Sequence, residues 1–462
     1  MDYPASKTVP WQHQIDFWNL SKNEKAYYAA HDMGCGKSKA AIDYANGIDA
    51  EKILIVCPKK VISVWPNQFS IHSHLNYHIL PLTKGSVKQK TVQAIKYLRR
   101  HQKIVIITNY EAFWRSPLGP TYNKKNRIVS PGTLMSYDWD LLIADEAHRI
   151  KSPGGSASWG MKRLRTTAKR VLFLSGTPMP HSPIDIYSQF RALAPKIYPP
   201  SFAQFKKRYC IMGGFEDRQV VSYINLDDLH KRFFSIAHHV TAEDTLDLPA
   251  KQTIVVTCDL DPSTLKIYRT LDKEFVAEYD AGIISADNAL VKLLRLAQLA
   301  GGYLALDDDA NHIIDNNKVD TVIELIKDIP MDEPVVIFCR FVNEIKRLKD
   351  MLKKIGRTPS EISGKTDELK KFQDGESDVV VTQIQAGGEG IDLTAARYCI
   401  YMSIGYSLGQ LLQSRKRVWR PGQEKKVFYY YVVANLTVDK KIAYAIKKRQ
   451  SVVDYVLKNL KD

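Results

Sequence analysis

The amino-acid sequence predicts an α/β protein with two domains, each built on a parallel β-sheet that is flanked by helices. The 462 residues exceed the usual size of a single domain, so we expect two hydrophobic cores. Short apolar runs rich in β-branched residues occur in two sets, and such runs are typical of strands covered on both faces. The first set comprises 52–57, 104–108, 141–144 and 171–174, and the second comprises 335–339, 379–382, 398–402 and 427–433.

The predicted domain boundary lies in the stretch between these two groups of apolar runs. Residues 180–330 read as mainly helical, with helical spacing of apolar residues in 266–282 and 289–300. Residues 301–318 are acidic and turn-rich, which predicts a hairpin or loop. The predicted parts are a first domain at 1–240 with a helical insertion near 180–240, and a second domain at 241–462 with a helical insertion near 261–300 and an amphipathic C-terminal helix at 437–460.

Composition limits the partner and the compartment. A formal net charge of +16 favours a polyanionic partner, most commonly nucleic acid, over a merely soluble basic protein. The six cysteines are scattered without a C-x-x-C pair, which argues against a zinc site or disulfide framework and fits a reducing compartment. Without a bilayer-length apolar run or a signal-peptide pattern, we expect no membrane partner and a cytoplasmic location, or a nuclear one in a eukaryote.

The segment AAHDMGCGKSKAA, residues 29–41, predicts a phosphate-binding loop between a strand and a helix. Gly34 and Gly36 let the backbone turn and aim N–H groups at phosphate, while Lys37 can reach the phosphates and Ser38 can ligate Mg²⁺. The usual pattern, G-x-x-x-x-G-K-[ST], has a glycine where this sequence has His31. Taken alone, the loop leaves open a chance G-x-G-K-S sequence.

A second acidic motif strengthens the nucleotide prediction. The strand in LLIADEAH, residues 141–148, delivers Asp145 and Glu146 at its carboxyl end, where parallel sheets bind ligands. Asp145 would hold Mg²⁺ and Glu146 would activate the attacking water. The alternative is an ordinary solvated turn after the strand.

Together with SGTP at 175–178, these motifs resemble helicase superfamily two, and in finer detail the Swi/Snf-type ATPases, including compact phage or bacterial members. The first motif of that family runs D-E-M-G-x-G-K-[ST], so the missing first glycine is a family trait. This sequence departs from the family pattern at His31 and Cys35. Further matches follow in order along nearly the whole chain, at Gln14, 57–65, 107–113, 335–341, 362–366, 385–396 and 413–423.

The resemblance implies two tandem RecA-like lobes that form a DNA-dependent ATPase with ATP and Mg²⁺ as cofactors. It implies nucleotide-binding roles for Gln14, Met33, Gly34, Cys35, Gly36, Lys37, Ser38, Gly390 and Asp392. The implied metal ligands are Ser38 and Asp145. The implied catalytic residues are Lys37, Asp145, Glu146, Arg417 and Arg420.

The two arginines carry a further prediction. Arg417 and Arg420 are three residues apart, so on a helix they would share one face. The resemblance implies that they reach the γ-phosphate as arginine fingers and link hydrolysis to lobe closure. A solvated basic helix is the alternative, and it fits Lys416 better than the arginines. Lys416 stands where the family often has an acid, and Trp419 where it often has His.

The resemblance also implies that both lobes grip the phosphate backbone of duplex DNA without reading its sequence. The implied contacts are Lys59, Trp65, Thr108, Asn109, Tyr110, Arg340, Gly364, Lys365, Gln385 and Gly387. Trp65 could equally be a core aromatic. The segment 114–131 adds Arg115, Lys124, Lys125 and Arg127, although a solvated loop is its simpler interpretation.

We therefore expect a monomeric translocase or helicase that couples ATP hydrolysis to movement on duplex or branched DNA in repair, recombination or replication, with replication or recombination proteins as candidate partners. The alternatives are a strand-separating helicase, an RNA-dependent DEAH-type ATPase, and a non-catalytic scaffold that displaces bound proteins. Cys35 adds a hypothesis of redox sensitivity, which burial of its thiol would remove.

Overall fold

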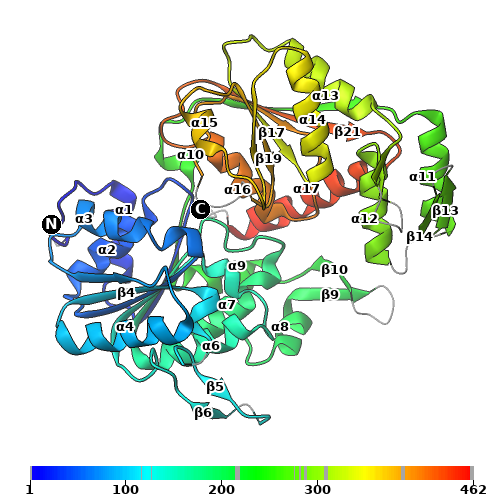
Figure 1. The fold of residues 1–462 in the computed structure, drawn as a ribbon. Helices are drawn as coiled ribbons and strands as arrows, with labels where there is room; N and C mark the ends of the chain where they lie inside the picture. The colour runs from blue at the N-terminus through cyan, green and yellow to red at the C-terminus, as the bar shows by residue number, and fades with distance from the viewer. Residues whose placement is uncertain are drawn as a thin grey trace. The chain divides into compact units, whose positions relative to one another are not determined.

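The computed structural model divides the chain into two compact units (Figure 1). Of the described residues, those up to Leu246 and those from Ser451 onward form the first unit, and Asp247–Gln450 forms the second. The described residues are 3–115, 117–125, 127–213, 219–274, 276–279, 282–285, 289–305, 311–386 and 391–457.

The first unit is built on a seven-stranded parallel sheet in the order β11-β1-β8-β7-β2-β4-β3. All four predicted strands of the first set are present. The strands are β1 (Ala26–His31), β2 (Lys52–Cys57), β3 (His78–Pro81), β4 (Ile104–Asn109), β7 (Trp139–Asp145), β8 (Ala168–Leu174) and β11 (Ala237–Val240). The central strands are buried along nearly their whole length, as continuous apolar runs require in a sheet covered on both faces.

Helices cover both faces of this sheet (Figure 1). Helices α2 and α3 lead to strands β2 and β3, which lie toward the β3 edge of the sheet, whereas α4, α6 and α7 lead to strands that lie back toward the β11 edge. Because such crossovers are right-handed, α2 and α3 lie on one face of the sheet and α4, α6 and α7 lie on the other. The helices are α1 (Gln12–Ser21), α2 (Lys37–Gly47), α3 (Val64–His72), α4 (Val87–Arg100), α5 (Tyr110–Phe113), α6 (Ser156–Leu164), α7 (Ile186–Leu193), α8 (Phe202–Tyr209), α9 (Leu226–Phe234) and α10 (Ala242–Thr245). Short 3₁₀ turns lie at Lys59–Val61, Ala147–Ile150, Arg165–Thr167 and Pro183–Asp185.

The helical reading of residues 180–240 is only partly correct. That stretch holds α7, α8 and α9, but it also contains the hairpin β9 (Cys210–Gly213)–β10 (Gln219–Tyr223) and the edge strand β11. β11 is four residues long and carries two histidines, so no long apolar run marks it. A second hairpin, β5 (Thr121–Tyr122)–β6 (Ile128–Ser130), precedes β7.

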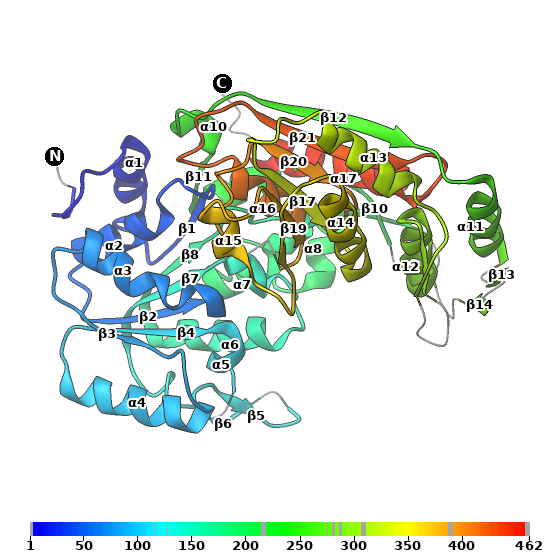
Figure 2. The same ribbon diagram turned by 45° about the horizontal axis from the view of Figure 1, so that its top comes forward.

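The second unit repeats the architecture with six parallel strands in the order β12-β21-β20-β17-β19-β18 (Figure 2). Its second set of predicted strands is confirmed. The strands are β12 (Lys251–Cys258), β17 (Val335–Cys339), β18 (Pro359–Ile362), β19 (Val379–Gln383), β20 (Tyr398–Tyr401) and β21 (Val427–Ala434). The helices are α11 (Pro262–Glu274), α12 (Ala289–Ala300), α13 (Asn317–Lys327), α14 (Val342–Lys354), α15 (Leu369–Gln373), α16 (Leu408–Val418) and α17 (Val438–Leu457).

One detail differs from the predicted secondary structure of this unit. The helix expected over 266–282 ends at Glu274, and the hairpin β13 (Val276–Tyr279)–β14 (Gly282–Ser285) follows it. The expected turn-rich segment is confirmed as the hairpin β15 (Tyr303–Ala305)–β16 (Asn311–Ile313). Among the residues that the structure describes, no helix combines the length and apolar character needed to cross a membrane.

Candidate nucleotide-binding site

The predicted phosphate loop joins the end of β1 to the start of α2. Gly34 and Gly36 both have positive φ, +87° and +67°, a left-handed conformation that glycine adopts without the penalty of a Cβ. Gly36 is the residue that caps the N-terminus of α2, so the first backbone N–H groups of the helix open toward the loop. The sequence prediction of strand, loop and helix start is therefore confirmed.

Lys37 folds its side chain back over this loop. Its Nζ donates hydrogen bonds to the carbonyl oxygens of His31 at 2.9 Å and Asp32 at 3.0 Å. These bonds hold the ammonium against the backbone of the loop, and the next residue, Ser38, is half-buried. A nucleotide phosphate at this position would meet one cation, one hydroxyl and the N-terminal dipole of α2.

Residues of the N-terminal helix α1 contact the backbone of the phosphate loop. The Gln14 side chain accepts a hydrogen bond from the Trp11 N–H at 2.9 Å and donates to the Gly36 carbonyl at 3.3 Å. A ring nitrogen of His13 lies 2.9 Å from the carbonyl oxygen of Cys35. Gln14, predicted from the resemblance alone, thus lies directly against the phosphate loop.

Asp145 and Glu146 lie at the carboxyl end of β7, two strands from β1 in the same sheet. The Asp145 carboxylate is buried and accepts hydrogen bonds from Trp65 Nε1 at 3.2 Å and from the Glu146 N–H at 3.0 Å. Burial, together with the negative charge of Glu146, raises the pKa of Asp145, while the Lys37 ammonium opposes this shift. The opposing effect of Lys37 places the two predicted motifs in one electrostatic site.

The SGTP segment completes this edge of the sheet. Ser175 Oγ lies 2.9 Å from His148 Nδ1, which is also 3.2 Å from the Glu146 carboxylate. A Cβ added to Gly176 would lie 3.1 Å from the Met33 backbone nitrogen, so this glycine permits the close approach to the phosphate loop. The contact between Ser175 and His148 was not predicted from the sequence, although Ser175 lies in the SGTP motif and His148 lies in the DEAH motif.

The residues present fit a magnesium–nucleotide complex. The site offers glycine N–H groups and the Lys37 ammonium for phosphate, and a hydroxyl and a buried carboxylate, from Ser38 and Asp145, as the oxygen ligands that Mg²⁺ prefers. Cys35 is fully buried, with its Sγ 3.5 Å from Thr245 Oγ1. Its burial removes the exposure that the redox hypothesis requires.

Four predicted nucleic-acid contacts of the first unit have buried side chains. Trp65 is 1% exposed and holds Asp145, so the core-aromatic alternative is correct for this residue. Tyr110 is also buried, and its hydroxyl donates to the Asp145 carbonyl at 2.9 Å. The Thr108 and Asn109 side chains are buried as well, whereas Lys59 is exposed in a 3₁₀ turn. Trp65 and Tyr110 thus support the acidic motif and present no surface to a duplex.

In the second unit, the two predicted arginines do not share one helical face. Helix α16 ends at Val418, so Arg417 lies in its last turn and Arg420 lies beyond it. Arg417 is buried, and its carbonyl accepts the Leu393 N–H at 3.0 Å. Arg420 forms an ion pair with Asp392 at 3.8 Å. The three-residue spacing failed as a helical argument because the chain leaves the helix between the two positions.

A buried glutamine fixes the loop that carries Arg420. Gln423 Nε2 donates to the carbonyl oxygens of Ala396 at 2.8 Å and Thr394 at 3.1 Å. At the helix end, Trp419 Nε1 donates to the Pro249 carbonyl at 2.8 Å, and Lys251 Nζ lies 4.0 Å from the centre of its indole ring. These contacts hold the arginine-bearing loop against the start of β12.

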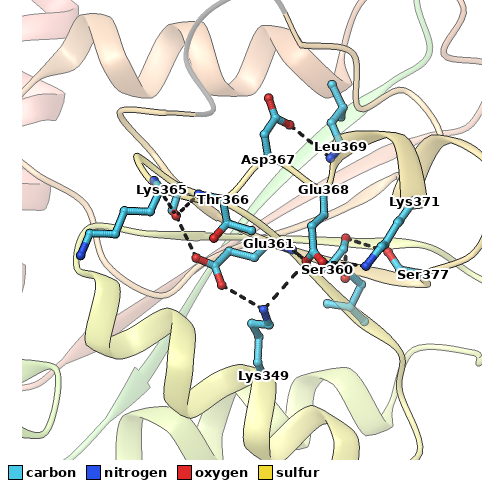
Figure 3. A network of polar contacts seen from close by, with 12 residues as sticks. Lys349, Ser360, Glu361, Lys365, Thr366, Asp367, Glu368, Leu369, Lys371 and Ser377 are labelled. Atoms are coloured by element: carbon cyan, nitrogen blue, oxygen red, sulfur yellow. Dashed lines mark hydrogen bonds and ion pairs between the residues drawn. The ribbon is translucent and has the colours of Figure 1, made fainter.

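The ISGKT turn presents Lys365 from a rigid polar base (Figure 3). Ser363 Oγ accepts the backbone N–H groups of Lys365 at 3.3 Å and Thr366 at 3.2 Å, and donates to Glu361 at 2.8 Å. Lys349 ties Glu361 at 2.9 Å to this network. The Lys365 side chain itself is exposed and points away from the network.

Of the other predicted residues in this unit, Arg340 is half-buried, with its backbone N–H donating to Ser403 Oγ at 2.7 Å, and Gln385 is exposed. Gly364 lies in the ISGKT turn, where an added Cβ would meet only Gln383 Oε1, at 4.0 Å. Gly387 and Gly390 lie outside the described residues.

The fold and the site define a two-lobed P-loop nucleoside triphosphatase of the helicase class. The SNF2-related domain matches residues 11–311, more than half of the chain, and the helicase conserved C-terminal domain matches residues 317–422. The chain therefore belongs to the SNF2-related family.

Relatives occur in animals, bacteria and phages. The chain is 26% identical over 453 residues to the SWI/SNF-related matrix-associated actin-dependent regulator of chromatin subfamily A-like protein 1 homolog of Caenorhabditis elegans, covering 94% of this chain and 59% of the relative. It is 24% identical over 470 residues to the putative ATP-dependent helicase/translocase YwqA of Bacillus subtilis, covering 97% and 49%. The chain thus spans about half the length of these two relatives.

A third relative is similar in length. The putative protein p41 of Acyrthosiphon pisum secondary endosymbiont phage 1 is 22% identical over 478 residues, covering 98% of both chains. Among solved structures, the SWI2/SNF2 ATPase core of Sulfolobus solfataricus in complex with dsDNA is 21% identical, covers 98% of this chain and 93% of its own, and has a TM-score of 0.44.

Proposed function

We propose that this protein is a DNA-dependent ATPase that uses ATP hydrolysis to translocate along duplex or branched DNA. The observation that carries the proposal is the arrangement of the phosphate loop, the DEAH carboxylates and the SGTP segment at one sheet edge in a chain of the SNF2-related family. The net charge of +16 supports a nucleic-acid track. Similar proteins carry the names ATP-dependent helicase/translocase and DNA excision repair protein.

The first unit would bind the nucleotide. The loop N–H groups and Lys37 would hold the phosphates, and Ser38 and Asp145 would hold Mg²⁺. The metal ion would supply charge neutralisation on the phosphate oxygens. Glu146 would orient the attacking water and accept its proton, while His148 fixes the position of the carboxylate.

The second unit would supply positive charge to the transition state. Arg417 and Arg420 are the proposed hydrogen-bond donors. The hydrogen bonds of Gln423 fix the loop that carries Arg420 and so restrict the positions that this side chain can adopt. The Asp392 carboxylate, proposed from the resemblance to contact nucleotide, would act by holding Arg420. Among the described residues, Lys59, Arg340, Gly364, Lys365 and Gln385 remain the proposed DNA contacts.

The proposed output is remodelling of branched or protein-bound DNA in repair, recombination or replication. The test is the ATPase rate of the full chain with single-stranded, duplex, forked and four-way DNA and with RNA. We expect duplex or branched DNA to stimulate turnover, and Lys37→Ala and Glu146→Gln to lower it by about 10³-fold or more. Stimulation by RNA alone would favour the RNA-dependent alternative, and turnover without any nucleic-acid response would contradict the proposal.

A further inference from the structure

The hairpin β5–β6 lies within the segment 114–131, outside the nucleotide site and outside the DNA contacts that the family motifs imply. It projects from the first unit next to α6 in both ribbon views (Figures 1 and 2). The hairpin has a firm base, because Thr133 donates its N–H to the Pro117 carbonyl at 2.7 Å and Leu134 donates to Leu118 at 3.0 Å. Leu118 and Leu134 are both buried in the core. These contacts tie both ends of the hairpin to the core of the first unit.

A glycine allows this base to close. Gly132 has a φ of +71°, and a Cβ at this position would lie 2.2 Å from the Gly119 carbonyl oxygen. Any other residue would push the two sides of the base apart. The close approach shows that the base of the segment is packed into the fold, while residues 123–125 and 127–129 are exposed, as the solvated-loop interpretation expects.

Hydrogen bonds of Asn123 link the described residues on the two sides of the turn. Asn123 donates its N–H to the Arg127 carbonyl at 3.0 Å, and its Oδ1 accepts the N–H groups of Lys125 at 2.9 Å and Arg127 at 3.0 Å. One asparagine thus shapes the turn from which the cationic side chains leave.

The tip carries concentrated and uncompensated positive charge. Lys124, Lys125 and Arg127 are exposed, and among the described residues none of the three forms an ion pair. The stretch from 112 to 137 contains no Asp or Glu. Elsewhere in this unit, basic side chains form ion pairs with carboxylates, as Lys169 Nζ does with Asp140 Oδ1 at 2.7 Å. Three like charges within four residues repel one another, and a polyanion would relieve that repulsion.

We propose that the β5–β6 hairpin is an additional phosphate-backbone contact for duplex DNA, made through Lys124, Lys125 and Arg127. This inference rests on the proposed DNA-dependent function, and it places a contact outside the motifs shared with the family. Lysine and arginine on an exposed turn suit sequence-independent phosphate contacts, which position a protein on the duplex without reading bases.

The test compares three triple variants of the full chain. K124Q/K125Q/R127Q removes the hairpin charge, and K124R/K125R/R127K retains it. K346Q/K353Q/K354Q removes the same charge from exposed positions on α14 and serves as the matched control. Duplex binding is measured by fluorescence anisotropy from about 50 to about 200 mM salt, and the slope of log Kobs against log salt is compared.

We expect removal of the hairpin charge to make this slope shallower by about 2 to 3, since each phosphate contact contributes about 0.9. The charge-retaining variant and the α14 variant should stay within one unit of the wild-type slope. ATP turnover without DNA should be unchanged in all three variants, because the hairpin does not touch the nucleotide site.

The inference is overturned if the hairpin variant changes the slope by less than one unit, or if the α14 variant changes it equally. If DNA still stimulates the wild-type enzyme, either outcome removes only the hairpin contact and leaves the proposed function standing. A small change of slope in the hairpin variant would point to another partner for the tip. A wild-type enzyme that neither binds nor responds to duplex DNA removes both.

Discussion

Glu146 adopts a backbone conformation that is uncommon for a residue with a Cβ, with φ +54° and ψ +51°. Such a left-handed position costs on the order of 1 to 2 kcal/mol. Strained positions of this kind cluster at functional sites because the surrounding structure can hold them. Here the strain directly follows β7 and leaves the carboxylate 3.2 Å from His148 Nδ1. At the residue scale, local geometry thus carries the proposed catalytic role.

The first prediction concerns Gly36. Gly36→Ala puts a Cβ at φ +67° and 2.4 Å from Gln14 Nε2, so the loop becomes strained and the Gln14 amide must move. We expect nucleotide affinity to fall by about tenfold or more, a cost of about 1.4 kcal/mol, measured by titration with a fluorescent ATP analogue. Gly154→Ala is the matched control because nothing lies within 4 Å of its added Cβ. Equal affinities of the two variants would contradict the prediction.

The second prediction concerns Trp65. Trp65→Phe keeps an aromatic ring in the core but removes the N–H that holds the Asp145 carboxylate. Hydrogen bonds to charged groups contribute about 1.5 to 3 kcal/mol, so we expect kcat to fall by roughly 10- to 100-fold with duplex affinity unchanged.

Trp139→Phe provides the comparison for this variant. Trp139 is equally buried, but its Nε1 donates to the Leu134 carbonyl, away from the nucleotide site. A loss of DNA affinity with normal ATP turnover in Trp65→Phe would show that the indole contacts nucleic acid after all.

At the scale of elements, the end of β1 is held by a cluster of histidines. His31 at the end of β1 lies with its Nε2 3.0 Å from Nδ1 of His238 in β11, and His13 of α1 packs edge-on against His31. Burial is the main cause that lowers the pKa of all three, well below its ordinary value for His31 and to about 4 for His238. The strand that leads into the phosphate loop is therefore joined to the edge strand through neutral imidazoles.

This cluster makes stability depend on pH. Because the folded-state pKa values are depressed, the unfolded chain takes up more protons below about pH 6.5, and folding stability falls as pH decreases toward about 4. Each buried neutral histidine contributes up to about 1.4 kcal/mol per pH unit in this window. We expect the urea midpoint of the wild type to fall between pH 7 and pH 5.

His238→Asn should flatten that decline, because it removes one titrating group while an amide can still bond to His31. His74→Gln changes an exposed histidine and should leave the decline as in the wild type. Identical pH profiles for the wild type and His238→Asn would show that the cluster does not control this dependence.

At the scale of the whole molecule, the chain consists of two units that have the same architecture but carry different functional residues. The first carries the phosphate loop and the acidic motif, and the second carries Arg417 and Arg420. Nearly all of the net charge of +16 belongs to the first unit, which has 36 Lys and Arg against 21 Asp and Glu, whereas the second has 30 against 29. Such an excess favours binding to the DNA backbone, which is the same in every sequence.

The corresponding prediction is binding without sequence preference. Two unrelated duplexes of equal length should bind the full chain with dissociation constants within about threefold, because backbone contacts carry no base information. Competition titrations at one fixed salt concentration measure the ratio. A preference of 10³-fold or more for one sequence, as in specific binding proteins, would contradict backbone tracking.

The sequence alone determined the long apolar strands of the two sheets, the phosphate loop and the family, because these depend on local patterns. Buried parallel strands need continuous apolar runs, and a phosphate loop needs glycines next to a lysine within a few residues. The seven-residue strand β7 and the turn at Gly34 and Gly36 follow directly from such patterns.

Only the tertiary structure decided which side chains face inward and which segments meet. Trp65 and Tyr110 match a family motif, but contacts with Asp145 from a distant strand make them core residues. β11 became a strand because β1 offered a free sheet edge, and its own short sequence shows no apolar run. Arg420 left the helix because Gln423 pins its loop to carbonyls near residue 395. Each of these outcomes depends on partners remote in sequence, which local patterns do not encode.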